Sequence, residues 1–432
     1  MWYTNAMMKF NDDNEIITEE RYRALLVGLQ TKEDITYSMD ELAGLAEAAN
    51  AEVLGKVTQT LERANTATLI GKGKVEEVAE LVRSMDADTV IFNDELSGAQ
   101  LRNLEDVIGV RVIDRTILIL DIFAARAESR EGKLQVELAQ LKYRMPRLIG
   151  FGKSLSRLGG GIGTRGPGEK KLETDRRHIE RRMDDIKEEL AQLRRTRSVQ
   201  RSRREKSSIP VVALVGYTNS GKSALMNRLL SVADKEEKAV MERDMLFATL
   251  DTKQRSIKLD TNHEFILVDT VGFVSKLPHS LIEAFKATLE EVLYADLLLH
   301  VVDASYEENK FHIDVTNRVI DEIGGGDREK ITVFNKIDLN PDFQPPATGT
   351  EQLFVSAKEN INIDRLIDAI KNKIFADKVC TQLLIPYDRG DISSYLCEKA
   401  LVQSMDYEAN GTRITLEMNQ EDYQRLKKYE II

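Results

Sequence analysis

Cysteine, histidine and long apolar runs are all scarce in this chain of 432 residues, and each shortage excludes a class of protein. The only cysteines are Cys380 and Cys397, which rules out a disulfide-rich scaffold and predicts a cytoplasmic location. No apolar run approaches the roughly 18–20 residues of a membrane span, so none is expected. Residues 1–10 have one basic residue and no long apolar core, unlike a secretory signal. Five scattered histidines offer no zinc-ligand spacing.

The sequence does contain enough apolar material for several packed cores. Hydrophobic residues are 42% and charged residues 31% of the chain, and domains of roughly 100–200 residues predict two to four of them. We expect an α/β part (1–114), a helical hairpin (115–206), a second α/β part (207–375) and a small α+β part (376–432). The predicted fold class is therefore multidomain α/β, with a mostly parallel sheet covered by helices on both faces in the third part.

Alternating strands and helices predict a largely parallel sheet in the first part. Two patterns with a glutamate or glutamine three residues after a serine, Ser38 with Glu41 and Ser97 with Gln100, predict capping boxes that open helices. A further helix is expected over residues 74–84. The expected strands are residues 24–27, 53–57, 89–92 and 110–113.

Positive charge is concentrated in one segment of an acidic chain. The net charge is −11, yet residues 142–206 carry 20 Lys and Arg against nine Asp and Glu, a local balance of +11, which leaves −22 for the rest. This asymmetry favours a basic element that contacts an acidic polymer. The alternative is a solvated helix face.

Apolar residues in the same region follow heptad spacing, which predicts an antiparallel helical hairpin. Pro146 is expected to end the first helix. The second helix is expected to reach roughly 35 Å and to fray into a linker over residues 194–206. The two apolar rows are Leu134, Leu138, Leu141 and Met145, and Leu172, Ile179, Met183, Ile186, Leu190 and Leu193.

The connection between the two helices, residues 150–168, is rich in glycine. Three basic residues, Lys153, Arg157 and Arg165, are interleaved with these glycines. Bare backbone and positive charge suit an irregular anionic partner, so these three are the candidate RNA-contacting residues. The alternative is a flexible linker.

A phosphate-binding loop begins the third part. The strand over residues 211–215 is followed by GxxxxGKS and a helix, the order that confirms such a loop. Its backbone N–H groups are expected to surround the phosphates, Lys222 to contact the β- and γ-phosphates, and the Ser223 hydroxyl to ligate Mg²⁺. The candidate nucleotide-binding residues here are Gly216, Tyr217, Thr218, Asn219, Ser220, Gly221, Lys222, Ser223 and Ala224.

A second motif predicts that the nucleotide is a guanine nucleotide. Asn335, Lys336, Ile337 and Asp338 follow a predicted strand over residues 331–334 and match NKxD. The Asp338 carboxylate can accept from both N1–H and the 2-amino group of guanine, which adenine lacks, so discrimination should be large. Ser356, Ala357 and Lys358 match the SAK element, whose backbone also contacts the base.

Two switch elements are expected between these motifs. Asp269, Thr270, Val271 and Gly272 match DxxG, in which Asp269 would hold Mg²⁺ through water and the Gly272 N–H would sense the γ-phosphate. Thr249 is the candidate switch threonine that ligates Mg²⁺. It lies within Phe247, Ala248, Thr249, Leu250 and Asp251. Lys222, Thr249 and Gly272 are therefore the predicted catalytic residues.

Phe273 occupies the position at which Ras-like proteins carry a water-orienting glutamine. An apolar ring cannot orient water by hydrogen bonding. Intrinsic hydrolysis is therefore expected to be slow, with rate enhancement from a partner or an ion.

With these motifs in order, the sequence resembles the HflX family of ribosome-associated GTPases over residues 20–375. The resemblance is carried by residues 71–77, 92–97, 132–141, 156–169, 273–279 and 288–291 together with the GTPase motifs. Ala224 departs from the family, which commonly has threonine there, and little effect is expected because Ser223 is retained.

The resemblance implies a cytoplasmic, Mg²⁺-dependent GTPase that binds GTP and GDP and the large ribosomal subunit with its rRNA. It implies that the protein, a monomer, helps to split or rescue stalled ribosomes under stress. It also raises ATP binding through Gly71–Lys74, although a turn that opens a helix is the preferred interpretation of those residues. Two alternatives are a regulatory module that recruits a protein effector through a coiled-coil hairpin and a helicase-like ATPase, which NKID disfavours.

Overall fold

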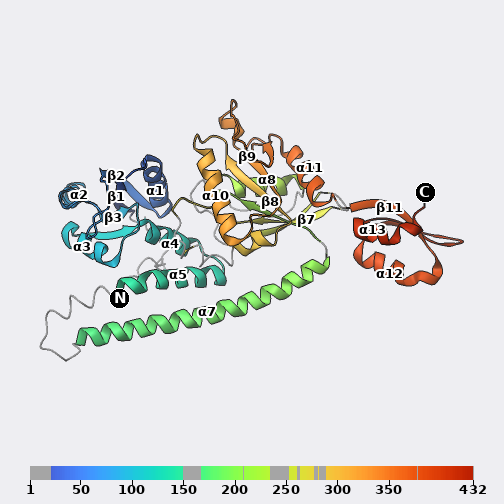
Figure 1. The fold of residues 1–432 in the computed structure, drawn as a ribbon, viewed down its shortest axis with the longest axis horizontal. Helices are drawn as coiled ribbons and strands as arrows, with labels where there is room; N and C mark the ends of the chain where they lie inside the picture. Colours follow the sequence, from blue (N-terminus) through green and yellow to red (C-terminus); the bar gives the residue numbers. More distant parts are fainter. Residues whose placement is uncertain are drawn as a thin grey trace, which may run out of the picture. The chain divides into compact units, whose positions relative to one another are not determined.

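The structure, a computed structural model, describes residues 21–148, 167–207, 209–233, 253–259, 263–276, 281, 289–376 and 378–431. The chain divides into two compact units, Met1–Leu118 and Ile119–Ile432, and Figure 1 shows the elements of each. Within the described ranges, no helix combines the length and the apolar character that a membrane crossing requires.

The first unit is built on a four-stranded sheet in which every neighbouring pair is parallel, as predicted. The strand order is β2-β1-β3-β4. Helices α2 (Lys72–Met85) and α3 (Gly98–Ile108) pack in one core with the sheet through side chains such as Val78 and Leu104. Helix α1 is Thr36–Ala48. The strands are β1 (Tyr22–Gln30), β2 (Ala51–Thr60), β3 (Thr89–Phe92) and β4 (Arg111–Asp114).

One predicted capping box in this unit is confirmed and the other is wrong. Ser97 and Gln100 satisfy each other's backbone N–H groups at the start of α3. Ser38, in contrast, lies inside α1, whose N-cap is Ile35. The Ser38 hydroxyl donates to Asn93 Oδ1 (2.9 Å).

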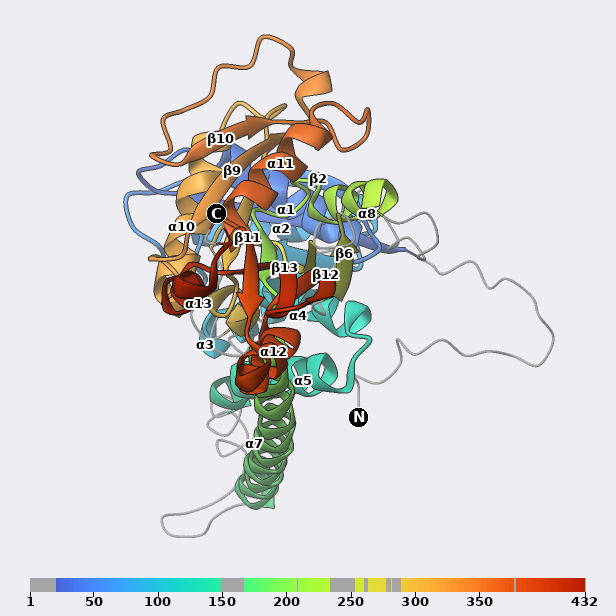
Figure 2. The same cartoon turned by 90° about the vertical axis from the view of Figure 1, so that its right-hand side faces the viewer.

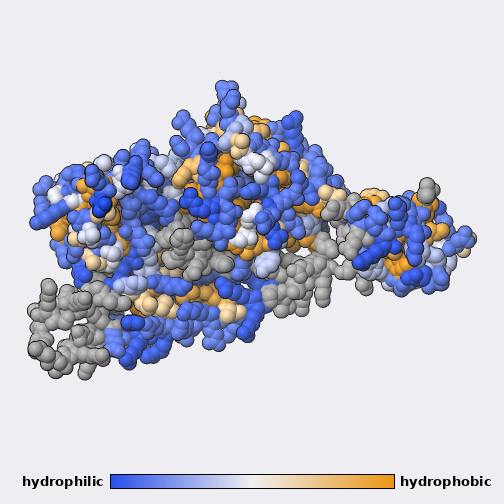
Figure 3. Space-filling model, viewed as in Figure 1, coloured by the Kyte–Doolittle hydropathy of each residue, from blue (hydrophilic) through white to orange (hydrophobic). Residues whose placement is uncertain are grey.

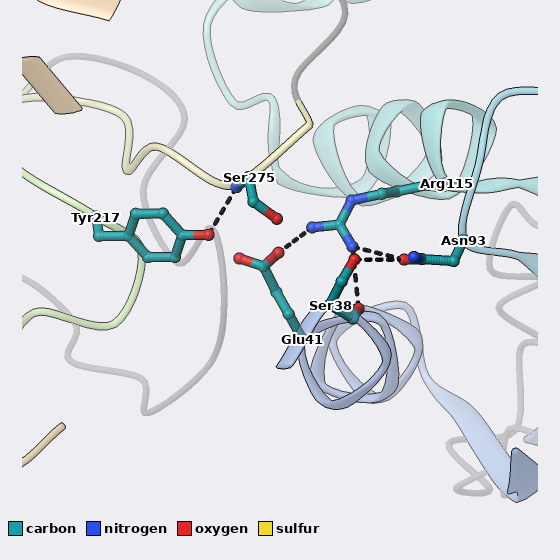
Figure 4. A network of polar contacts seen from close by, with 6 residues as sticks. All are labelled: Ser38, Glu41, Asn93, Arg115, Tyr217 and Ser275. Atoms are coloured by element: carbon teal, nitrogen blue, oxygen red, sulfur yellow. Dashed lines mark hydrogen bonds and ion pairs between the residues drawn. The ribbon is translucent and has the colours of Figure 1, made fainter. Parts of the chain in front are cut away.

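Glu41, the other half of the expected box at Ser38, instead forms a buried ion pair with Arg115. The Arg115 guanidinium also donates to Asn93 Oδ1 (3.1 Å). Figure 4 shows the side chains of Ser38, Glu41, Asn93 and Arg115 joined in one network. Its contacts join residues far apart in the sequence, so short-range spacing does not predict them.

The second unit contains the predicted antiparallel helical hairpin. Helix α4 (Arg115–Arg126) precedes α5 (Arg130–Leu148), which runs beside α7 (Pro167–Ser207). Polar pairs flank the seam, and Arg182 donates to both oxygens of Glu137 (2.7 Å each). Figure 3 shows hydrophilic residues along the outer side of α7. The apolar seam is Leu134, Leu138, Met183, Ile186 and Leu190, with Leu141, Met145, Ile179 and Leu193 packed against it.

The ends of both hairpin helices differ from the prediction. Helix α5 continues through Pro146 to Leu148, and Arg147 stacks on the Tyr143 ring while donating to the Tyr143 carbonyl (2.7 Å). Helix α7 has 41 residues and does not fray at residue 194. It is about 60 Å long at 1.5 Å per residue, which exceeds the expected 35 Å.

A six-stranded sheet of order β10-β9-β8-β5-β7-β6 follows. Every pair is parallel except β6 with β7, which confirms a mostly parallel sheet. Helices α8 (Lys222–Ala233) and α11 (Ile363–Ile374) pack in one core, and α10 (Asn309–Ile323) packs in another, so helices cover both faces. The strands are β5 (Val211–Val215), β6 (Lys253–Lys258), β7 (Glu264–Asp269), β8 (Leu297–Asp303), β9 (Lys330–Asn335) and β10 (Glu351–Phe354).

The last part of the chain is a small antiparallel sheet of order β11-β13-β12, visible in Figure 2, with a hairpin across Asn410 and Gly411. Helices α12 (Gly390–Lys399) and α13 (Gln420–Leu426) share one core with it. The strands are β11 (Lys378–Ile385), β12 (Leu401–Glu408) and β13 (Gly411–Asn419).

Candidate nucleotide-binding site

The phosphate-binding loop lies between β5 and α8, at the carboxyl edge of the sheet where open α/β folds bind ligands. Gly221 has a φ of +87°, and a Cβ there would lie 2.3 Å from Asn335 Nδ2. Gly216 has a φ of +151°, and a Cβ there would meet the Val301 carbonyl at 2.2 Å. Only glycine fits at both places, so the motif glycines are required by close packing as well as by backbone conformation.

Lys222 is the buried cation of this loop. Its Nζ donates to the carbonyls of Gly216 (3.0 Å) and Tyr217 (2.7 Å), and the residue is 6% exposed. Burial lowers the pKa of Lys222 to about 8, while the Asp269 carboxylate acts in the opposite direction. A phosphate group beside this ammonium would stabilise its charged form.

Two hard oxygen donors lie together at the start of α8 and the end of β7. The Ser223 hydroxyl donates to Asp269 Oδ2 (2.7 Å), and Asp269 is fully buried. The described residues contain no group of three or more His, Cys, Asp and Glu that could hold a metal by itself. A hydroxyl beside a carboxylate suits Mg²⁺, which commonly takes few protein ligands and completes its shell with phosphate and water.

Asn335 joins three loops of the site. Its Nδ2 donates to the Ser220 carbonyl (3.0 Å) in the phosphate loop, and its Oδ1 accepts from the Ala357 N–H (3.0 Å) in the SAK loop. The residue is 2% exposed at the end of β9. Because this one side-chain amide bonds to both loops, the phosphate loop, the NKID motif and the SAK loop form one assembly.

The remaining NKID residues are held in a turn beside this assembly. Lys336 has a φ of +64°, and its Nζ pairs with Asp303 Oδ2 (2.8 Å) at the end of β8. Asp338 lies in a short 3₁₀ turn, Ile337–Leu339. Its Oδ1 is buried and has no hydrogen-bond partner among the described residues. A buried carboxylate oxygen in this state fits the N–H donors of guanine.

The SAK loop is supported by a residue that the sequence interpretation missed. Arg228, on α8, donates through Nε to the Ala357 carbonyl (2.7 Å) and through Nη2 to the Lys358 carbonyl (2.8 Å). No local pattern distinguishes this arginine, because its role depends on two segments about 130 residues apart. Asp303, which pairs with Lys336, was missed because the two residues lie 33 positions apart, at the ends of different strands.

Phe273 faces the core beneath the site. It is 1% exposed and packs with Val268, Val292 and Leu298. Its backbone, in contrast, contacts the phosphate loop: its carbonyl accepts from the Thr218 N–H (2.7 Å), and its N–H donates to the Gly216 carbonyl (3.1 Å). The Phe273 side chain thus packs in the core, where it cannot orient a water molecule.

Two sets of predicted residues lie outside the described ranges. They are the first switch, residues 247–251 with Thr249, and the hairpin tip with Lys153, Arg157 and Arg165. The structure therefore brings together the phosphate loop, DxxG, NKID and SAK residues, and the two remaining sets stay predictions.

Comparison with protein families assigns most of the chain. Three family models match in succession: "GTP-binding GTPase N-terminal" over residues 36–124, "GTP-binding GTPase Middle Region" over 126–204 and "50S ribosome-binding GTPase" over 211–336. The GTPase HflX of Caldanaerobacter subterraneus is 49% identical over 418 residues, which cover 97% of this chain and 96% of that protein. The chain belongs to the GTPase HflX family. It is therefore a P-loop GTPase, an enzyme that hydrolyses GTP.

A more distant relative in the same family matches over a similar length, and a solved structure of a GTP-binding protein is also similar to this chain. The GTPase HflX of Escherichia coli is 39% identical over 94% of this chain and 96% of its own. A solved structure of a GTP-binding protein from Sulfolobus solfataricus in complex with GDP is 25% identical, covers 82% of this chain and 98% of its own, and has a TM-score of 0.44.

Proposed function

We propose that this GTPase binds the large ribosomal subunit through its rRNA and, with GTP bound, splits or rescues stalled ribosomes under stress. The observation that carries the proposal is the combination of a preassembled nucleotide site with a 41-residue helix in the most basic part of the chain. A long basic arm suits a phosphate-rich partner. We expect the protein to act as a cytoplasmic monomer.

In this proposal, the nucleotide residues have the following roles. Lys222 neutralises charge that develops on the β- and γ-phosphates, and the Gly272 N–H contacts the γ-phosphate. Asp338 reads guanine, while Asn335 keeps the base loops in place. Ser223 and Thr249 would ligate Mg²⁺, with Asp269 acting through water. The ion would neutralise phosphate charge when bound.

Hydrolysis by the free protein is proposed to be slow. The buried Phe273 side chain cannot orient water, and a partner-supplied group can accelerate GTPases by roughly 10³–10⁵-fold. The large ribosomal subunit is the proposed source of that group. Lys153, Arg157 and Arg165 are the proposed RNA contacts of the arm.

The alternative of a dimerising coiled coil is less well supported. The apolar residues of the hairpin, with Ile186 fully buried, pack between α5 and α7 of one chain. Little of that apolar seam is therefore left to pack against a helix of a second copy of the chain. The basic balance of residues 142–206 also favours RNA over a protein partner.

The test is cosedimentation with purified large and small ribosomal subunits, in GDP or a non-hydrolysable GTP analogue and over a salt series. We expect GTP-dependent binding to the large subunit that weakens steeply with salt. Initial GTPase rates with each subunit complete the experiment. Equal rates with the large subunit, the small subunit and no subunit would contradict the proposal.

A further inference from the structure

Tyr217, inside the phosphate loop, belongs to a stack of rings that the GTPase motifs do not explain. The residue is 3% exposed. Its ring stacks on His312 of α10 with centroids 3.9 Å apart and planes 12° apart. His312 in turn stacks on Tyr306, at 4.8 Å and 10°. A ring held on one face in this way has little freedom to change rotamer.

The Tyr217 hydroxyl contacts the second switch. It accepts a hydrogen bond from the Ser275 backbone N–H (2.6 Å), as Figure 4 shows. Ser275 is 4% exposed and lies three residues after Gly272. The two backbone hydrogen bonds of Phe273 to the phosphate loop hold the same segment. Residues 272–275 are therefore tied to residues 216–218 at three points.

The position of this segment determines where Gly272 lies. A Cβ on Gly272 would be 2.8 Å from Thr218 Cγ2 and 3.1 Å from Lys222 Nζ, so its backbone is immediately beside the cation of the site. Groups that contact a transferring phosphate act only when they are placed correctly, and an error of about 1 Å is costly. Since Phe273 supplies no water-orienting group, the placement of the Gly272 N–H carries more of the catalytic task.

We propose that Tyr217 is a positioning residue for GTP hydrolysis. Its hydroxyl fixes residues 272–275 through Ser275, and His312 fixes the tyrosine ring. The proposal rests on the GTPase function and extends it to a residue whose side chain no nucleotide-binding motif requires. It does not depend on ribosome binding.

The test is Tyr217→Phe in the full chain, with Tyr294→Phe as the matched control because Tyr294 is 51% exposed in the same unit. Tyr217→Phe keeps the ring and leaves the buried Ser275 N–H without its acceptor. Removal of a buried hydrogen bond should make amide hydrogen exchange in residues 271–276 about tenfold faster or more. We expect kcat for intrinsic GTP hydrolysis to fall about tenfold, while KM and GDP affinity stay within about twofold.

A second pair of variants tests the ring stack. His312→Ala should also speed exchange in residues 271–276, and His312→Phe, which retains a stacked ring, should restore protection. Unchanged exchange or unchanged kcat in Tyr217→Phe would overturn the proposal, as would equal effects in Tyr294→Phe. If the unaltered chain hydrolyses GTP but no ribosomal subunit stimulates it, the proposed function fails, while the role of Tyr217 is still decided by intrinsic rate and exchange.

Discussion

At the scale of single residues, the proposed guanine selectivity depends on the position and burial of the Asp338 carboxylate. Asn335, three residues before Asp338, is held between the phosphate loop and the SAK loop, and the Asp338 Oδ1 is buried without a partner among the described residues. A ligand that cannot donate to this oxygen leaves it desolvated and unpaired. That cost, more than any gain with GTP, should exclude ATP.

Asp338→Asn should therefore exchange one base preference for another. The change removes the acceptor for two guanine donors, which should lower GTP affinity by about 10²–10⁴-fold. Xanthosine triphosphate should gain affinity, because its 2-oxo group can accept from the new amide. Competition with a fluorescent GTP analogue measures both effects, and Asp342→Asn, at an exposed aspartate in the following loop, is the control. A variant that still prefers GTP over ATP as the parent does would refute the assignment.

The buried ammonium of Lys222 should make nucleotide binding depend on pH. Its pKa is about 8 in the folded chain, below the usual value of 10.5, because burial disfavours the charge. The proton is therefore bound by the unfolded chain but lost from the folded chain between those values. Folding stability should rise across this window as pH rises, and GTP binding, which restores the charge, should take up a proton.

At about pH 8.5 we thus expect GTP binding to take up roughly three-quarters of a proton, and affinity to fall as pH rises further. Titration calorimetry in buffers of different ionisation enthalpy measures this uptake. Lys222→Arg is the control, because a guanidinium stays charged at this pH and has no proton to gain. An uptake that is equal in both proteins would show that another group titrates.

Phe273→Gln should not create a Ras-like enzyme. The side chain is 1% exposed and faces the core, so a glutamine there would bury an amide and remove packing. We expect the free energy of unfolding of the unit to fall by about 3–5 kcal/mol and the intrinsic GTPase rate not to rise. Phe273→Leu, which keeps an apolar side chain, should lose less stability. Denaturant unfolding and single-turnover rates measure the two effects, and a faster Phe273→Gln enzyme would contradict this packing argument.

At the scale of helices and strands, most patterns with a local cause were predicted correctly, although the helix end expected at Pro146 was wrong, and contacts between distant residues were not predicted. The Ser97 capping box depends on a neighbour three residues away, and the two apolar rows and the strand before the phosphate loop are patterns within single elements. The capping box predicted at Ser38 is wrong. Ser38 lies inside α1, and its hydroxyl donates to Asn93, 55 residues later. Arg228 was missed because its two acceptors lie in a loop 129 and 130 residues farther on.

Helix α7 continues past its predicted end at residue 194, and the cause is helix propensity and ion pairing, which hydrophobic spacing does not measure. Straight-chain Arg, Lys, Glu and Gln have good helix propensity, and pairs one turn apart, such as Arg177 with Glu173 (2.6 Å), add to it independently of apolar packing. Farther along, Arg197 pairs with Glu131 across the hairpin. The end of apolar periodicity at residue 194 therefore marked the end of the seam and not the end of the helix.

The hairpin should depend on its apolar seam far more than on its ion pairs. Ile186 is fully buried, whereas the side chains of Arg182 and Glu137 are 43% and 39% exposed. Ile186→Ala should destabilise the hairpin by about 2–5 kcal/mol, and Arg182→Gln by less than about 1 kcal/mol. Amide hydrogen exchange along α5 and α7 measures both. A larger effect from Arg182→Gln would mean that the polar flank, and not the seam, holds the helices together.

At the scale of the whole molecule, the uneven charge separates two tasks. Residues 142–206 hold an excess of eleven positive charges in a chain whose net charge is −11. The nucleotide site, in contrast, is expected to obtain its selectivity from a few buried groups, such as the Lys222 ammonium and the Asp338 Oδ1. Long-range attraction to RNA depends on salt and on total charge, while buried contacts to a nucleotide depend on neither to the same extent. The two affinities should therefore respond to different mutations.

Reversal of the three tip charges, Lys153, Arg157 and Arg165 to Glu, should weaken binding to the large subunit. The salt slope of that binding should fall by up to about one unit for each RNA phosphate that the variant no longer neutralises. GTP affinity of the free protein should stay within about twofold, because no proposed nucleotide-binding residue is changed. An equal reversal at three exposed residues, Lys310, Arg318 and Arg365, controls for the change in net charge. If the tip variant splits ribosomes normally, the tip is only a spacer. If it loses GTP binding instead, residues of the tip contribute to the nucleotide site.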